Sequence, residues 1–209
     1  MAHKDLSWKY VEEQTVEPDV IVAARAQSLE LGVEAISAAT GAQIAVITAA
    51  LQAGTMIEIG TGIGVSGLWL LQGAPDAHLT SIDVEADHHE VARRHFTEAG
   101  HAAARVRLIT GRAADVLPRM NEHDYDVVLI DADAGALLDY VEHALRLVRA
   151  GGAVLVPHAL WRDTVSDPAK RDGTTADLRE LITELSASPA IHLAVSPVGD
   201  GLLQIITSR

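Results

Sequence analysis

A glycine-rich segment carries the clearest chemical signal in this sequence. Gly60, Gly62 and Gly64 follow the short apolar run Thr55–Ile59, a pattern that is typical of a strand ending in a tight turn. Glycine lets the backbone approach a ligand closely, and the free N–H groups of a following helix face that ligand. The segment 58–64 therefore predicts a binding site for a nucleotide-like cofactor.

Two carboxylates indicate which class of cofactor this site would bind. Glu58 precedes the glycines, where its charge suits the cationic methionine end of S-adenosylmethionine and would repel a pyrophosphate. Asp83 ends the next predicted strand, where a carboxylate can accept hydrogen bonds from both ribose hydroxyls, although NAD enzymes share this feature. The small residues of the segment 111–114 follow the third strand and could cover an adenine ring. An ordinary surface carboxylate at Glu58 and a helix N-cap at Asp83 are the alternatives.

Positioning these residues requires a parallel sheet, and the hydrophobic pattern predicts one. Strands are predicted at 55–59, 79–83, 105–110, 126–130, 153–156, 191–195 and 202–206. Helices are predicted at 18–31, 40–51, 66–71, 88–100, 114–120, 140–148 and 177–185. Their alternation indicates right-handed crossovers, and the turn at 197–201 predicts a final hairpin. We therefore expect an α/β fold, with a mostly parallel central sheet, a C-terminal antiparallel strand and helices on both faces.

Composition limits the other possibilities. The chain has 209 residues, of which 48% are hydrophobic, and this predicts a single domain with an N-terminal helical segment at 1–53 and a core at 54–209. The absence of cysteine excludes disulfides and thiolate chemistry. A net charge of −13 argues against a nucleic-acid partner, and no apolar run reaches membrane-spanning length. We expect a cytoplasmic protein, in which the segment 1–17 has no diagnostic motif.

Five motifs together resemble the catechol and caffeoyl-CoA type O-methyltransferase family. They lie at 56–66, 82–83, 125–133, 147–152 and 197–202. The resemblance covers about residues 30 to 208. It implies a Rossmann-like class I methyltransferase fold, transfer of a methyl group from S-adenosylmethionine to a hydroxyl that is usually phenolic, and a homodimer.

The glycine turn and the resemblance together predict the cofactor site. The expected contacts are Ile36, Glu58, Gly60, Thr61, Gly62, Ser66, Asp83, Ala113, Asp131 and Asp133. The acceptor is expected to be a small molecule that contacts Asp131, His158 and Trp161. Trp161 would form a wall for a flat acceptor, with plain packing as the alternative.

The metal site of the family is the main departure. Typical members bind Mg²⁺ through the first aspartate of an Asp-Ala-Asp-Lys segment and through an Asp-Asn pair after the next strand. Here Asp131 keeps the first position, Ala134 replaces the lysine, and Pro157 and His158 stand at the Asp-Asn pair. Proline has no side-chain donor atom, and one imidazole does not replace a carboxylate plus an amide. We therefore expect no usual Mg²⁺ site.

His158 is the candidate catalytic residue in place of the metal. It follows a predicted strand at its carboxyl end, beside the expected cofactor site, and histidine suits general-base catalysis at neutral pH. A loop histidine without a role is the alternative.

Three functions remain open. The first is an O-methyltransferase that works without the usual metal. The second is a non-catalytic S-adenosylmethionine-binding protein, which the changed metal positions suggest. The third is an NAD(P)-dependent oxidoreductase, since Gly62, Gly64 and Gly67 also fit the dinucleotide fingerprint.

Overall fold

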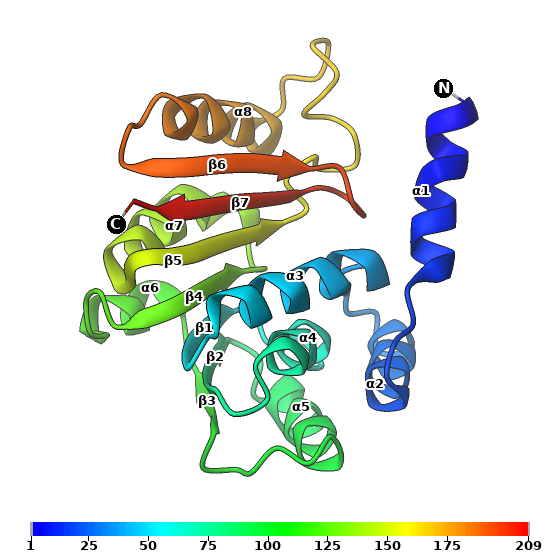
Figure 1. Cartoon of the computed structure of the whole chain (residues 1–209), viewed down its shortest axis with the longest axis vertical. Coiled ribbons are helices and arrows are strands. Elements are labelled where there is room, and N and C mark those ends of the chain that lie inside the picture. Colours follow the sequence, from blue (N-terminus) through cyan, green and yellow to red (C-terminus); the bar gives the residue numbers. More distant parts are fainter. Residues whose placement is uncertain (1, 209) are drawn as a thin grey trace.

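The computed structural model describes residues 2–208, with side chains from residue 6 onward, so the two end residues of the predicted domain lie outside it. Within this range the strands form a seven-stranded sheet in the order β3-β2-β1-β4-β5-β7-β6 (Figure 1). The strands are β1 (Thr55–Ile59), β2 (His78–Asp83), β3 (Val106–Thr110), β4 (Tyr125–Ile130), β5 (Val148–Pro157), β6 (Ile191–Ser196) and β7 (Leu202–Thr207). β1 to β5 pair in parallel, while β7 is antiparallel to both β5 and β6. The predicted fold class is confirmed.

Helices cover both faces of the sheet (Figure 1). One hydrophobic core joins the sheet to α2 (Asp19–Glu30), α3 (Ala38–Leu51), α4 (Val65–Gly73) and α5 (Ala86–Glu98). The other joins it to α6 (Ala113–Val116), α7 (Leu137–Leu147) and α8 (Gly173–Ser186). Strands β1 to β5 and β7 contribute to both cores because successive side chains point to opposite faces, whereas the apolar side chains of β6 pack only against the second core. In β1, Met56 belongs to the first core, whereas Ile57 and Ile59 belong to the second.

Two predicted elements differ from the structure for local reasons. The helix predicted at 114–120 divides into α6 and a short 3₁₀ helix, η1 (Leu117–Arg119). Pro118 lacks the N–H that a continuous α-helix would use. Strand β5 begins five residues earlier than predicted. Val148 already pairs with Tyr125, and the register then shifts before Val127 pairs with Ala153. A second 3₁₀ helix, η2 (Ala134–Ala136), leads into α7.

The N-terminal segment forms α1 (Ala2–Gln14), which stands away from the sheet (Figure 1). Glu12 attaches it to the start of α3, accepting hydrogen bonds from Ser37 Oγ at 2.6 Å and from the Ala39 N–H at 3.0 Å. Trp8 and Tyr10 are 40% and 63% exposed, so these aromatic side chains pack only partially against the rest of the protein. No helix in the described range has the length and apolar character that a membrane span requires.

Candidate active site

The strand order creates the main cavity. β1 lies between β2 and β4, so the order of the strands along the chain reverses at this point, where ligands bind in open α/β sheets. A cavity of about 330 Å³ opens here, lined by residues that follow β1, β2 and β4. The glycine turn, Asp83 and Asp131 therefore meet although they are far apart in the sequence.

The shape of the glycine turn is set by the close approach of the ends of β1, β2 and β4. The Gly60 N–H donates to the Ile82 carbonyl and the Asp131 N–H donates to the Ile59 carbonyl, both at 2.8 Å. Gly60 has φ +93°, and a Cβ there would lie 1.8 Å from the Asp131 carbonyl oxygen. Gly64, at φ +95°, directly precedes α4. Only glycine satisfies both the backbone angle and the space at Gly60.

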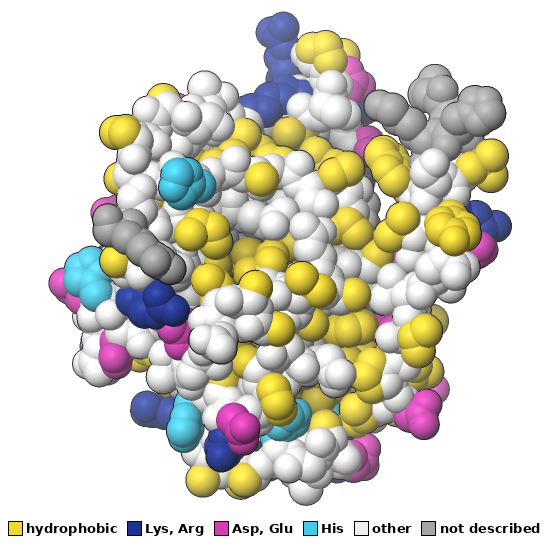
Figure 2. All heavy atoms as spheres, viewed as in Figure 1, with side chains coloured by type: hydrophobic (Ala, Val, Ile, Leu, Met, Phe, Trp, Pro, Cys, Tyr) yellow, Lys and Arg dark blue, Asp and Glu magenta, His cyan; other side chains and the backbone are white. Residues whose placement is uncertain are grey.

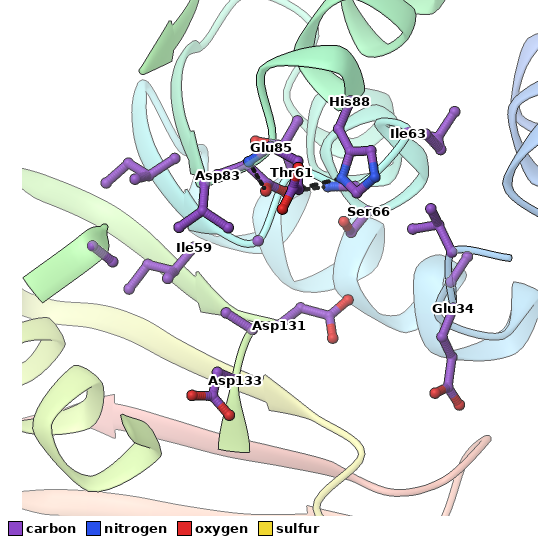
Figure 3. A pocket seen from close by; sticks show the side chains of 18 of the residues that line it. Glu34, Ile59, Thr61, Ile63, Ser66, Asp83, Glu85, His88, Asp131 and Asp133 are labelled. Atoms are coloured by element: carbon purple, nitrogen blue, oxygen red, sulfur yellow. Dashed lines mark hydrogen bonds and ion pairs between the residues drawn. The ribbon is translucent and has the colours of Figure 1, made fainter. Parts of the chain in front are cut away.

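Asp83 presents its carboxylate to the cavity from the end of β2. One oxygen accepts the Gly62 N–H and the other accepts the Glu85 N–H, both at 2.9 Å. Glu85, not Asp83, is the N-cap residue of α5. Figure 3 shows His88 beside this carboxylate, with Nδ1 at 3.8 Å from Oδ2. The geometry leaves carboxylate lone pairs available to hydroxyl donors of a ligand.

Glu58 lies beneath the cavity and not on its surface, since it is 0% exposed. Strand alternation directs its side chain toward α4, where it accepts hydrogen bonds from Ser66 Oγ at 2.7 Å and Ser81 Oγ at 2.5 Å. Burial raises the pKa of Glu58 to about 8, against the lowering effect of these two hydroxyls. Ser66 does line the cavity, so Glu58 reaches the ligand space through that hydroxyl.

A buried histidine extends this network. Thr61 Oγ1 lies 2.6 Å from Ser81 Oγ and 3.0 Å from His89 Nε2, and His89 Nδ1 lies 3.0 Å from Thr110 Oγ1. Burial lowers the pKa of His89. The network ties together the ends of β1, β2 and β3. The spacing of His89, Ala92 and Phe96, all buried on one face of α5, is the sequence signal for this placement.

The charged side chains that line the main cavity are predominantly acidic. Its described lining contains no lysine or arginine but five carboxyl side chains, namely Glu34, Asp83, Glu85, Asp131 and Asp133. Figure 3 shows Asp83 and Glu85 on one side, across from Asp131 and Asp133. Such a lining favours a cationic ligand and opposes a pyrophosphate.

A smaller cavity of about 40 Å³ adjoins the main one through Asp131 and Ala132. Apolar side chains make most of its wall, and His158 and Trp161 also line it. His158 Nε2 lies 3.7 Å from Asp131 Oδ1. Burial raises the pKa of Asp131, nearby Glu34 adds to this effect, and His158 opposes it. This cavity therefore combines an apolar wall with a carboxyl group and an imidazole.

The structure brings most of the predicted site residues together. Gly60, Thr61, Gly62, Ser66, Asp83, Ala113, Asp131 and Asp133 all line the main cavity. Ile36 and Glu58 do not. Ile36 is buried in the core, and its carbonyl accepts a hydrogen bond from Arg25 Nη1 at 2.5 Å. Sequence reasoning missed other lining residues, including 33–35, His88 and Tyr140, because no motif marks them and only the folded chain brings them here.

The fold and the cavity define a Rossmann-like protein whose main cavity suits a cationic nucleotide-like ligand. Comparison with known proteins agrees. The O-methyltransferase family matches residues 13–207. A relative from Mycobacterium sp. (strain KMS), named "Putative O-methyltransferase", is 41% identical over 193 residues, which are 91% of this chain and 88% of the relative.

Solved structures show the same likeness. A Corynebacterium glutamicum protein has a TM-score of 0.89 and 30% identity, and the match covers 100% of this chain and 98% of that one. The O-methyltransferase TomG of Streptomyces achromogenes, solved in complex with S-adenosylmethionine, has a TM-score of 0.83 and 26% identity, with 94% and 92% covered. The present chain belongs to the O-methyltransferase family. It is an S-adenosylmethionine-dependent O-methyltransferase, which confirms the expected family, enzyme class and cofactor.

Proposed function

We propose that this enzyme methylates a hydroxyl group of a small acceptor, such as a phenol, without a Mg²⁺ ion. The observation that carries the proposal is the adjacency of the two cavities. The main cavity suits a cationic cofactor, and the smaller one places an imidazole and a carboxyl group at their junction. The acceptor hydroxyl would enter at this junction.

The proposed cofactor site has two layers. Gly60, Thr61, Gly62, Ser66, Asp83, Ala113, Asp131 and Asp133 are the proposed contacts that line the cavity. Ile36 and Glu58 are proposed to support them from behind. Asp83 suits the ribose hydroxyls because its carboxylate is already held by two backbone N–H groups. The surrounding carboxylates suit a sulfonium cation.

The donor atoms at the family's metal position do not fit Mg²⁺. That ion prefers octahedral oxygen ligands, whereas this position offers the Asp131 carboxyl group, the His158 imidazole and Pro157, which has no side-chain donor. Among residues 6–208, whose side chains the structure describes, no group of three or more His, Asp or Glu side chains is arranged to hold a metal. A reaction path that does not depend on the family metal is therefore proposed.

His158 is proposed as the general base. S-adenosylmethionine supplies an activated methyl group, so the protein needs mainly to orient the acceptor and to take up its proton. His158 Nε2 faces Asp131 across the junction, and Trp161 lines the same small cavity as a wall for the acceptor. The hydroxyl proton would pass to Nε2 as the oxygen–methyl bond forms and the sulfur–methyl bond breaks.

A non-catalytic S-adenosylmethionine-binding protein is the second candidate, since the lysine and metal positions are changed. The match to the O-methyltransferase family does not favour this candidate, and it favours an NAD(P)-dependent oxidoreductase still less. A homodimer and a cytoplasmic location also stay predictions.

The experiment measures binding first and turnover second. In calorimetric titrations, S-adenosylmethionine should bind well and NADH should not. Asp83→Ala should weaken binding about 10- to 100-fold through loss of charge-assisted hydrogen bonds, whereas the control Asp87→Ala, at an exposed position on α5, should not. Tighter binding of NADH would contradict the proposal.

Turnover is measured as S-adenosylhomocysteine released with a panel of phenols and catechols. Methylation that continues in EDTA supports metal-independent catalysis. Inhibition by EDTA that Mg²⁺ reverses would contradict it. His158→Ala should lower kcat on the order of 100-fold, while an unchanged kcat would remove His158 as the base.

A further inference from the structure

We propose that Asp200 is a positioning residue that orients His158 and fixes which imidazole nitrogen carries the proton. This inference rests on the proposed role of His158 as base. Asp200 lies in the turn between β6 and β7, 42 residues from His158 in the sequence. Its Oδ2 lies 3.3 Å from His158 Nδ1.

The register of the sheet brings these two residues together. β5 and β7 are antiparallel, and Pro157, the last residue of β5, pairs with Leu202, the first of β7. The residue after Pro157 and the residues before Leu202 therefore meet at the same edge of the sheet. His158 and Asp200 occupy these positions, so the contact follows from the strand pairing.

Asp200 also holds the loop that carries His158. Its Oδ1 accepts the Arg162 N–H at 2.7 Å, and its carbonyl accepts the Leu160 N–H at 2.9 Å. His158, Trp161 and Arg162 have φ values of +58°, +46° and +54°. Non-glycine residues keep this left-handed conformation only when surrounding contacts stabilise it. The side chain and backbone of Asp200 supply several of these contacts.

Gly201, next to Asp200, lets the turn between β6 and β7 approach the loop after β5 closely. A Cβ at Gly201 would lie 2.6 Å from Leu160 Cγ and 2.8 Å from the Leu160 nitrogen. The turn and the loop after β5 therefore touch without space between them. A loop held in this way places the imidazole in one orientation at the junction of the two cavities.

The orientation has a chemical consequence. An ionised carboxylate only accepts hydrogen bonds, so its contact with Nδ1 assigns the proton of the neutral imidazole to Nδ1. Nε2 then carries the lone pair. Its nearest carboxyl oxygen, on Asp131, is 3.7 Å away, which exceeds a hydrogen bond. Nε2 is free to take the acceptor's hydroxyl proton, and the resulting imidazolium lies between Asp131 and Asp200.

Asp200→Asn separates orientation from loop structure. The asparagine oxygen can still accept the Arg162 N–H, which leaves the amide NH₂ facing Nδ1. An NH₂ group donates, so the imidazole should move its proton to Nε2 and lose its capacity as a base. We expect kcat to fall on the order of 100-fold, with the Kd for S-adenosylmethionine unchanged. Asp163→Asn, an exposed carboxylate in the same loop, is the matched control and should keep wild-type kcat.

A double-mutant cycle distinguishes positioning from a general structural effect. If Asp200 acts through His158, adding Asp200→Asn to His158→Ala should cause no further loss of kcat. A multiplied loss would overturn the inference. Full activity of Asp200→Asn alongside an impaired His158→Ala would also overturn it while leaving the proposed base intact. Full activity of His158→Ala would instead reject the base itself.

Nitrogen-15 NMR tests the same inference without any acceptor. The His158 signals, identified by their loss in His158→Ala, should show a proton on Nδ1 in the neutral wild-type imidazole. Asp200→Asn should shift the proton to Nε2, and Asp163→Asn should not. The same tautomer in the wild type and in Asp200→Asn would contradict the assignment.

Discussion

Glu58 shows how one residue changes its meaning when the structure is considered. The sequence places a carboxylate beside the glycine turn, and charge alone suggests direct contact with a cationic cofactor. Strand alternation instead directs the side chain into the interior, where two hydroxyls donate to it. Burial favours the protonated form of Glu58. Ionising this side chain therefore costs free energy in the folded state and not in the unfolded chain.

A pH dependence of stability follows for the protein without cofactor. The pKa of Glu58 rises from 4.5 to about 8 on folding, so between these values the folded state keeps a proton that the unfolded chain loses. The free energy of unfolding should therefore fall with rising pH by at most about 1.4 kcal/mol per pH unit from this group, and level off above pH 8. Glu58→Gln should lack this component in denaturant melts from pH 5 to 9.

The prediction is tested by the difference in the free energy of unfolding between Glu58→Gln and the wild type at each pH. The stability of Glu58→Gln relative to wild type should increase from pH 5 to pH 8. The control, Glu90→Gln at an exposed position on α5, should follow the wild-type curve. Parallel curves for Glu58→Gln and wild type would contradict the assigned pKa.

At the scale of elements, the site depends on how strand ends meet. Gly60 lies where β1, β2 and β4 end together, and its backbone position leaves no room for a side chain. The obstacle at Gly60 is the backbone of Asp131, which directly follows β4 and is held by its N–H donating to the Ile59 carbonyl. This backbone cannot rotate away as a side chain would. The glycine turn is therefore a packing requirement of the sheet as well as a cofactor site.

Gly60→Ala should be strongly destabilising. A Cβ at 1.8 Å from the Asp131 carbonyl oxygen and a φ of +93° together should cost about 3 kcal/mol or more, and S-adenosylmethionine binding should be lost. Denaturant melts and calorimetry measure these effects. Gly173→Ala is the control, since nothing lies within 4 Å of its added Cβ, and it should be neutral or slightly stabilising. Near-wild-type stability of Gly60→Ala would refute the packing account.

At the scale of the whole molecule, α1 is the least integrated element. It stands apart from the sheet (Figure 1), and Leu6, Tyr10 and Val11 are 63%, 63% and 46% exposed. Figure 2 shows apolar side chains on this part of the surface. Burying such side chains against a second copy of the chain would be favourable, which agrees with the homodimer that the family resemblance implies.

The predicted homodimer should appear in light scattering coupled to size-exclusion chromatography. Tyr10→Glu should shift the mass toward the monomer because a charge would have to be buried in the interface. Leu138→Glu is the control, since Leu138 is 42% exposed on α7, which packs on the opposite face of the sheet from the helices near α1. A monomeric wild type would reject the prediction.

The sequence by itself determined the strands, the main helices after α1 and the glycine turn, because hydrophobic period and glycine placement act over short distances. It also indicated Asp83 and the altered metal position, since both stand at recognisable strand ends. Only the tertiary structure decided that Glu58 is buried, that His89 joins three strand ends, and that Asp200 contacts His158. Those outcomes depend on strand register and on which face a side chain meets, which are set by pairing between segments far apart in the chain.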